Sequence, residues 1–324
     1  MVVDVRGYSR VLVTGGGGFI GSHLVDRLLG EGFEVVVLDD FSSGRVENLK
    51  HHFGRDGFVF VRGDVRDRDV VGRVVEGVDV VFHLAALVSV PVSVEDPVLV
   101  EDVNVGGTLN VLKACVDAGV KRFVFAGSCA VYGEGCGVPR CEDDVLDPIS
   151  PYGVSKLAGE FYCRVFYRVY GLETVVLRYF NVYGPRQVYG PYSGVISIFI
   201  SRLLEGKPPV IFGDGSQVRD FVYVKDVVEA NFLAMFSKNA VGGVFNVGSG
   251  RCTSINELAG LLIELMGVDV EPVYSDPRPG DIRYSCADIG RARKVLGFEP
   301  RVDLRDGLLE TIVWFKENYG KKTV

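Results

Sequence analysis

The sequence lacks the hallmarks of several protein classes. Its 324 residues include no basic run and carry a net charge of −7, which excludes the electrostatic footprint of a nucleic-acid-binding protein. The longest apolar stretches, such as 35–38 and 78–86, have the length of a strand and are too short to cross a bilayer. Asp4 and Arg6 interrupt the start of the chain, so no signal peptide is expected. The sequence thus predicts a cytoplasmic protein without a membrane or nucleic-acid partner.

Cysteine is present but forms no pattern. The seven cysteines are irregularly spaced, which argues against a secreted disulfide framework, and none combines with the four histidines in the spacing of a zinc site. We therefore expect no metal, and we interpret Cys129, Cys136 and Cys141 as small buried side chains. A disulfide stays open for a hyperthermophilic source, with which the presence of only two glutamines is consistent.

Apolar runs and helical patterns alternate through the first half of the chain. Strands are expected at 11–13, 34–38, 58–61, 78–83, 122–126 and 174–177, and helices at 19–29, 67–76, 97–118 and 152–170. Strands that are apolar almost throughout are typical of a parallel sheet covered on both faces. The sequence predicts an α/β fold with a doubly wound, Rossmann-type sheet.

The alternation becomes less regular after residue 181. Helices are expected at 196–204, 225–236, 254–266 and 304–319, with only short strands between them. We predict a dinucleotide-binding domain over 1–180, with about 225–250 returning to it. Residues 181–224 and 251–324 are predicted to form a smaller α/β substrate-binding lobe.

A glycine-rich turn follows the first strand and opens the first helix. Gly15, Gly18 and Gly21 permit a tight turn, a close approach to a pyrophosphate, and packing of helix on strand. Asp39 ends the second strand, 18 residues after Gly21, where a carboxylate can bond ribose hydroxyls and repel the 2′-phosphate of NADP. NAD is therefore the predicted cofactor. Asp64, after the third strand, is expected either to meet the adenine or to cap the strand end.

Three further residues suggest proton chemistry. Tyr152 and Lys156 are four residues apart on one helix face, where the lysine can stabilise a phenolate. Ser128 directly follows the fifth strand, at the carboxyl edge where α/β proteins bind ligands. Its hydroxyl could bond a reacting alcohol and pass on its proton.

The glycine turn, Asp39, Ser128 and the Tyr152–Lys156 pair together resemble the extended short-chain dehydrogenases, and more closely the UDP-hexose 4-epimerases. The resemblance runs from about Val11 to the C-terminal helix. It implies a homodimer formed through the helices at 97–118 and 152–169. It also extends the NAD site to a larger set of residues: Phe19, Ile20, Asp40, Ser42, Ser43, Gly44, Val65, Leu84, Ala85, Ala86, Asn104 and Tyr179. Val88 departs from one branch of the family, which has a cofactor-contacting lysine there.

The resemblance also implies a UDP-sugar site. Arg219 and Arg278 match diphosphate-binding arginines, and Asp281 is placed for the uridine ribose. Ser285 matches the residue beside the sugar 2-position, where a small side chain leaves room for an N-acetyl group. The remaining substrate residues implied are Ser89, Val195 and Asn181, in addition to Ser128 and Tyr152.

The reaction implied is a redox-neutral 4-epimerisation of UDP-glucose, and of UDP-N-acetylglucosamine, through a 4-keto sugar. Tyr152 would take the 4-hydroxyl proton through Ser128, and hydride would pass to NAD and return to the opposite face of the sugar. A dehydratase would need acids where Cys129 and Ala130 stand. A UDP-glucuronate 4-epimerase, a dTDP-sugar enzyme and a non-catalytic NAD sensor are the alternatives; the sensor would be expected to lack Tyr152 or Lys156.

Overall fold

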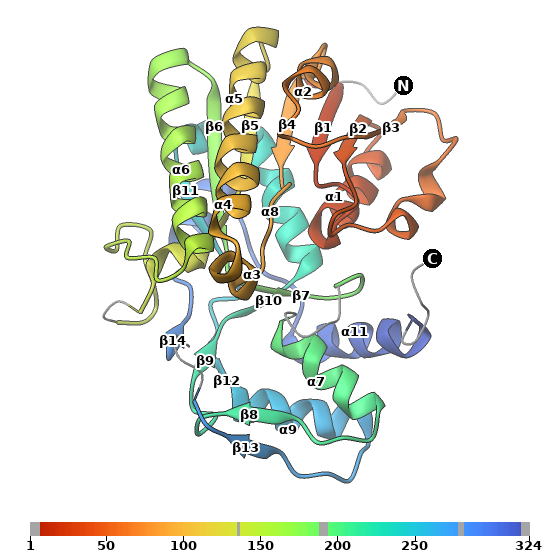
Figure 1. The fold of residues 1–324 in the computed structure, drawn as a ribbon, viewed down its shortest axis with the longest axis vertical. Coiled ribbons are helices and arrows are strands. Elements are labelled where there is room, and N and C mark those ends of the chain that lie inside the picture. Colours follow the sequence, from red (N-terminus) through yellow and green to blue (C-terminus); the bar gives the residue numbers. More distant parts are fainter. Residues whose placement is uncertain (1–6, 135–136, 188–193, 278–281, 319–324) are drawn as a thin grey trace.

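The computed structural model describes residues 7–134, 137–187, 194–277 and 282–318. A large sheet with its helices fills one end of the molecule, and a smaller group of helices and short strands lies at the other (Figure 1). Among the described residues, no helix is long and apolar enough to span a membrane.

The large sheet confirms the predicted doubly wound architecture. Its strands are all parallel and lie in the order β11-β6-β5-β4-β1-β2-β3. They are β1 (Arg10–Thr14), β2 (Glu34–Asp39), β3 (Phe58–Arg62), β4 (Val80–His83), β5 (Arg122–Ser128), β6 (Glu173–Tyr179) and β11 (Val244–Val247). The strand order reverses beside β1, because β2 and β4 flank it on opposite sides. In such sheets the crevice at the reversal is where ligands bind.

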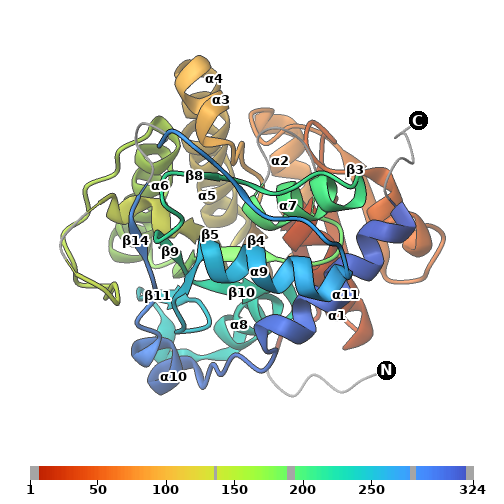
Figure 2. The ribbon, with the colours of Figure 1, turned by 90° about the horizontal axis from the view of Figure 1, so that it is seen from below.

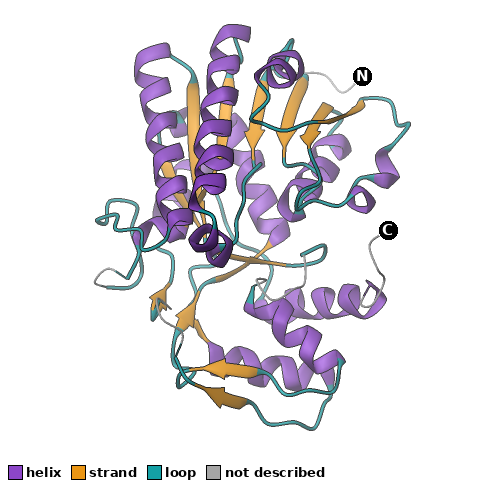
Figure 3. Cartoon of the chain, viewed as in Figure 1, coloured by secondary structure: helices purple, strands orange, loops and turns teal. Residues whose placement is uncertain are grey.

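Helices cover both faces of this sheet (Figure 3). On one face, α1 (Phe19–Gly30) and α8 (Val224–Phe236) pack together, and on the other α2 (Arg68–Val75), α5 (Gly107–Ala118) and α6 (Pro151–Tyr170) do so. The strands supply β-branched side chains to both layers. For example, Val35 and Val37 of β2 belong to one apolar cluster and Val36 to the other. This two-sided burial explains why the strands are apolar at successive positions.

The helix predicted over 97–118 has a more complex form. It consists of α4 (Pro97–Glu101), a π-helical segment (Asp102–Gly106) and α5, preceded by the short α3 (Val90–Glu95). The helix predicted over 97–118 is therefore confirmed in its bounds, but it contains a π-helical segment that the sequence did not indicate. π-Helical segments inside α-helices are frequent at functional sites, and this one contains Asn104.

The smaller lobe has its own apolar core, built mainly from three helices and three of its short strands. Its strands are short and lie in separate two- and three-stranded sheets. Seen from below, α9 and α7 lie in front of the large sheet (Figure 2). Its elements are β7 (Asn181–Tyr183), α7 (Val195–Leu204), β8 (Val210–Phe212), β9 (Val218–Arg219), β10 (Phe221–Tyr223), β12 (Thr253–Ser254), α9 (Ile255–Met266), β13 (Val273–Ser275), β14 (Tyr284–Ser285) and α11 (Leu304–Asn318).

Two features of the C-terminal third could not be read from the sequence. The helix α10 (Gly290–Leu296) lies within the predicted lobe segment 251–324, yet its Ala292 and Leu296 belong to the apolar core of the large sheet. Cys252 and Cys286, which are 34 residues apart, form a disulfide. That bond joins the segment before β12 to the end of β14. Cys129 and Cys141, which were expected to be buried, are half-buried free thiols, and Cys136 lies outside the described residues.

Candidate active site

Only glycine fits at the two ends of the turn after β1, at positions 15 and 21. Gly15 has a φ of +71°, and a Cβ there would lie 2.7 Å from the backbone nitrogen of Ala85. A Cβ on Gly21 would lie 2.2 Å from the carbonyl oxygen of Gly15. The turn is therefore held directly against the end of β4 and against the start of α1.

The N-terminus of α1 is available to an anion. Gly18 is its N-cap and makes no side-chain capping bond, so no side chain occupies the first N–H groups at this position. Phe19 and Ile20 form the first turn and are half-buried. Free N–H groups and the positive end of the helix dipole favour a phosphate group at such a position.

Asp39 is buried at the end of β2 and fixes the glycine turn. Its Oδ2 accepts a hydrogen bond from the backbone N–H of Gly17 at 2.8 Å, and its Oδ1 accepts one from Phe41 at 2.7 Å. Burial raises the pKa of this carboxyl. The following residues, Asp40, Ser42, Ser43 and Gly44, form a loop in which Asp40 accepts both the backbone and hydroxyl bonds of Ser42.

The remaining residues of the predicted cofactor site lie beyond β3 and β4. Asp64 accepts hydrogen bonds from the backbone and the guanidinium of Arg66, as expected for a residue that closes a strand end. Val65 is buried, while Leu84, Ala85 and Ala86 follow β4 directly and are half-buried. The adenine contact predicted for Asp64 stays a prediction.

Asn104 links the loop after β4 to α6. Its Nδ2 donates to the carbonyl oxygen of Leu87 at 3.0 Å and to Oγ of Ser155 at 2.9 Å, and its Oδ1 accepts from Leu87 N–H at 2.8 Å. The side chain is almost fully buried. Asn104 therefore positions the loop relative to the helix that carries Tyr152 and Lys156, which the sequence alone did not indicate.

The structure brings Ser128, Tyr152 and Lys156 together. Ser128 ends β5, and its hydroxyl lies close enough to Tyr152 to lower the pKa of the phenol. Ser150 caps α6 by accepting the N–H of Gly153, which places Tyr152 in the first turn of the helix. The Lys156 Nζ lies 6.0 Å from the centre of the Tyr152 ring and donates to the carbonyl of Ala126 at 3.0 Å.

Burial shifts the pKa values of Tyr152 and Lys156 in opposite directions. It raises the pKa of Tyr152 to about 12, although the nearby Ser128 hydroxyl lowers it in part. It lowers the pKa of Lys156 to about 8, so the ammonium persists at neutral pH but gives up its proton more readily than usual. A neighbouring cation favours the phenolate form of a tyrosine. Lys156, which lies on the same helix as Tyr152, supplies such a cation.

On the substrate side, Asn181 offers an unused hydrogen-bonding atom. Its side-chain Oδ1 is buried and has no hydrogen-bond partner among the described residues. Leaving such an atom unpaired costs about 1–3 kcal/mol, which a bound ligand would recover. Tyr179, two residues earlier, is buried and donates its hydroxyl proton to Asn231 at 2.9 Å.

Arg219 and Ser285 meet beside the reactive cluster. The strands β9 and β14 pair so that Arg219 and Ser285 are direct neighbours, and Ser285 Oγ lies 3.9 Å from Cys129 Sγ. Ser89 caps α3, and Val195 begins α7. Arg278 and Asp281, the other predicted diphosphate and ribose ligands, lie outside the described residues.

Two buried carboxylates organise the site, and sequence reasoning missed both. Asp220 accepts hydrogen bonds from the backbone N–H groups of Ser249, Gly250 and Ala287, which fixes the strand next to Ser285. Glu160 forms a buried two-bond ion pair with Arg178, at 2.7 and 2.9 Å. Arg178 directly precedes Tyr179, but its guanidinium is used inside the protein.

These observations fit a nicotinamide dinucleotide. The glycine turn leaves no room for a side chain at positions 15 and 21, and no side chain caps the N-terminus of α1. Asp39 ends β2, where dinucleotide-binding folds commonly carry an acidic residue. A Rossmann sheet with a Ser–Tyr–Lys cluster at its carboxyl edge defines the class of the short-chain dehydrogenases/reductases. More specifically, the chain belongs to the NAD dependent epimerase/dehydratase family, whose sequence model matches residues 11–248.

Similar proteins that align with almost the whole chain support this assignment. A UDP-glucose 4-epimerase of Mycolicibacterium smegmatis is 45% identical over 95% of this chain and 98% of its own. The crystal structure of a Thermotoga maritima UDP-glucose 4-epimerase with UDP-glucose has a TM-score of 0.90 at 46% identity, covering 95% and 99% of the two chains. A UDP-N-acetylglucosamine 4-epimerase from Methanobrevibacter ruminantium, in complex with UDP-N-acetylmuramic acid, has a TM-score of 0.92 at 41% identity, covering 97% and 100%.

Proposed function

We propose that this protein is a UDP-hexose 4-epimerase that interconverts UDP-glucose and UDP-galactose, and UDP-N-acetylglucosamine and UDP-N-acetylgalactosamine. The observation that carries the proposal is the cluster in which the half-buried Tyr152 lies beside the buried side chains of Ser128 and Lys156. The relatives named above, at 41–46% identity, act on or bind UDP-sugars by their own descriptions.

The cluster is suited to moving one proton in both directions. Tyr152 accepts the proton of the sugar 4-hydroxyl through Ser128, and Lys156 stabilises the phenolate that this requires. NAD, when bound, supplies an acceptor that takes hydride from C4 and gives it back. The C4–H and O–H bonds break as the 4-keto group forms, and both form again after the sugar has turned over. The net reaction is neither an oxidation nor a reduction.

The residues beside Ser128 favour epimerisation over dehydration. Removal of water from the sugar needs an acid close to the ring, but Cys129 and Ala130 stand there. Burial raises the pKa of the Cys129 thiol to about 11, so it is neither an acid nor a nucleophile at neutral pH. In addition to Ser128 and Tyr152, the substrate contacts that we propose among the described residues are Ser89, Asn181, Val195, Arg219 and Ser285.

The small side chain of Ser285 supports the second substrate pair. It leaves space next to Cys129 and Arg219 that a tyrosine would fill. We expect Ser285→Tyr to lose activity on UDP-N-acetylglucosamine and to keep activity on UDP-glucose, because only the former carries the bulky 2-substituent. Comparison of kcat/KM for the two substrates measures this; equal losses on both would contradict the steric argument.

The proton NMR spectrum of the purified protein with each UDP-sugar tests the reaction itself. We expect the 4-epimer to appear without added NAD if the cofactor stays bound, and with added NAD otherwise. Tyr152→Phe should reduce kcat by about 10²–10⁴-fold, whereas Tyr170→Phe, on the exposed end of the same helix, should not. If the protein converts UDP-glucuronate but neither UDP-glucose nor UDP-N-acetylglucosamine, the result would favour the alternative, a UDP-glucuronate 4-epimerase.

We also propose a homodimer that buries an exposed apolar face on α6, α3 and α4. These helices pack beside one another, and their exposed apolar side chains include Val90, Val94, Val98, Val154, Phe161, Val165 and Val169. Contiguous apolar surface of this kind typically marks an interface. Light scattering should give a dimer for the native chain and a monomer for Phe161→Glu; a native monomer would refute the proposal.

A further inference from the structure

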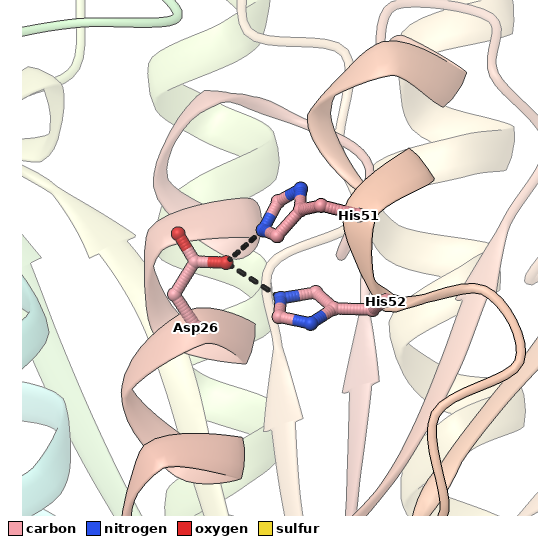
Figure 4. Close-up of side chains that lie close together, drawn as sticks. All are labelled: Asp26, His51 and His52. Carbon is pink, nitrogen blue, oxygen red and sulfur yellow. Dashed lines mark hydrogen bonds and ion pairs between the residues drawn. The ribbon is translucent and has the colours of Figure 1, made fainter.

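Asp26, His51 and His52 form a cluster away from the catalytic residues. Asp26 lies on α1, and the histidines belong to a 3₁₀ turn, Lys50–His52. Their Nε2 atoms lie 2.9 and 2.7 Å from the same Asp26 oxygen, Oδ1, and Figure 4 shows both imidazoles pointing at that carboxylate. One ligand atom from each residue lies within 4.8 Å of the other two. Three side chains from two elements thus direct metal-ligating atoms at one small volume.

The two histidines differ in a way that suits an ion site. The His52 side chain is only 6% exposed, and its Nε2 is directed at Asp26. The His51 side chain is 50% exposed and gives the cluster an opening to solvent. A neutral imidazole is the form that binds a metal, and the opening allows water to complete the coordination.

Arg186 holds the other oxygen of Asp26. Its guanidinium lies 2.7 Å from Oδ2, which leaves Oδ1 turned toward the histidines. Burial opposes the ionisation of Asp26, but Arg186 and the two histidines outweigh it and keep the pKa of the carboxyl below its usual value. Ligating carboxylates are commonly oriented in this way by a second hydrogen bond. The charge of Arg186 also offsets that of Asp26, so an ion must be held mainly by its bonds to imidazole.

We propose that Asp26, His51 and His52 bind a divalent transition-metal ion of the zinc type, with water completing a tetrahedral site. Bonds of about 2.0–2.1 Å in a tetrahedron place ligand atoms about 3.4 Å apart. The hydrogen-bonded separations are 2.7 and 2.9 Å, so the ligands must spread by about half an ångström. Imidazole donors suit zinc, cobalt or nickel and do not suit magnesium or calcium. The ion would link α1 to the 3₁₀ turn Lys50–His52.

Cobalt(II) titration of the full-length, chelator-treated protein tests the site. We expect one equivalent to bind with the visible absorption of tetrahedral cobalt and without a thiolate charge-transfer band in the near ultraviolet. His51→Gln and Asp26→Asn should each weaken binding at least tenfold, because even the loss of an outer partner costs about 10–100-fold. His51 is half exposed, so its replacement leaves the fold intact.

His23→Gln is the matched control, because His23 lies on the same helix as Asp26 but its Nε2 contacts the carbonyl of Pro185. It should bind cobalt like the native chain. Zinc should raise the melting temperature of the native chain and of His23→Gln, but not of His51→Gln, and magnesium should change none of them. Lack of binding, thiolate absorption, or equal affinity of His51→Gln would each overturn the proposal. None of these results depends on the reaction proposed above.

Discussion

Replacement of Lys156 with methionine is expected to stabilise the protein while it abolishes activity. The lysine side chain is almost completely buried, and its ammonium donates one hydrogen bond, to the carbonyl of Ala126. Burial of the charge lowers the pKa of Lys156 from 10.5 to about 8. At about 1.4 kcal/mol for each pH unit, the charged group costs the folded state about 3 kcal/mol. Methionine removes this cost and loses one hydrogen bond worth about 1 kcal/mol, so we expect a net gain of about 2 kcal/mol at pH 7.

The same difference in pKa fixes the direction of the pH dependence. Below pH 8 both folded and unfolded chains are protonated at Lys156, and the whole penalty applies. Between pH 8 and 10.5 the unfolded chain binds more protons than the folded chain, so the native protein gains stability as the pH rises. The advantage of Lys156→Met should therefore shrink across this window and vanish above it.

Urea denaturation of NAD-free protein at pH 7 and pH 10 measures both effects. The control is Lys113→Met, on the exposed face of α5, where the lysine pairs with Asp117. Such surface pairs contribute less than about 1 kcal/mol, so the control should differ little from the native chain. The reasoning is refuted if Lys156→Met is less stable than the native protein at pH 7, or if its advantage does not change with pH.

Three further changes test other parts of the structure. Glu160→Leu leaves the buried guanidinium of Arg178 unpaired and should destabilise the fold by about 3–5 kcal/mol; a loss below 1 kcal/mol in thermal unfolding would contradict this. Gly21→Ala should lower the NAD content of the purified protein, because its Cβ would overlap a backbone oxygen, whereas Gly30→Ala has no atom within 4 Å and should not. Asp39→Ser should raise the affinity for NADP relative to NAD by removing a repelling carboxylate, and an unchanged ratio of dissociation constants would argue against that role.

Local sequence signals were sufficient for six of the seven strands of the large sheet and for the reactive cluster, but they did not single out β11. The β-branched runs predicted β1 to β6 because strands buried on both faces are apolar throughout. The glycine turn has a steric requirement that is visible at positions 15 and 21. Tyr152 and Lys156 lie within one helical turn of each other, so their juxtaposition could be predicted from their spacing alone.

Features that depend on tertiary contacts could not be predicted in this way. Glu160 and Arg178 meet only because α6 packs on the sheet, and the Cys252–Cys286 bond joins residues that are 34 apart. His51 and His52 are adjacent and match no ligand motif until α1 brings Asp26 to them. The cytoplasmic location, the homodimer and the division into domain and lobe stay predictions.

The most direct test of the central claim follows the hydrogen at C4 of the sugar. UDP-glucose carrying deuterium at C4 is incubated with the enzyme in ordinary water, and the deuterium in the UDP-galactose formed is measured by NMR and mass spectrometry. If C4 gives up hydride and receives the same hydride back within the closed site, the deuterium should be retained at C4 of the product. Replacement of deuterium by solvent hydrogen during epimerisation would contradict the account, as would the absence of any 4-epimer.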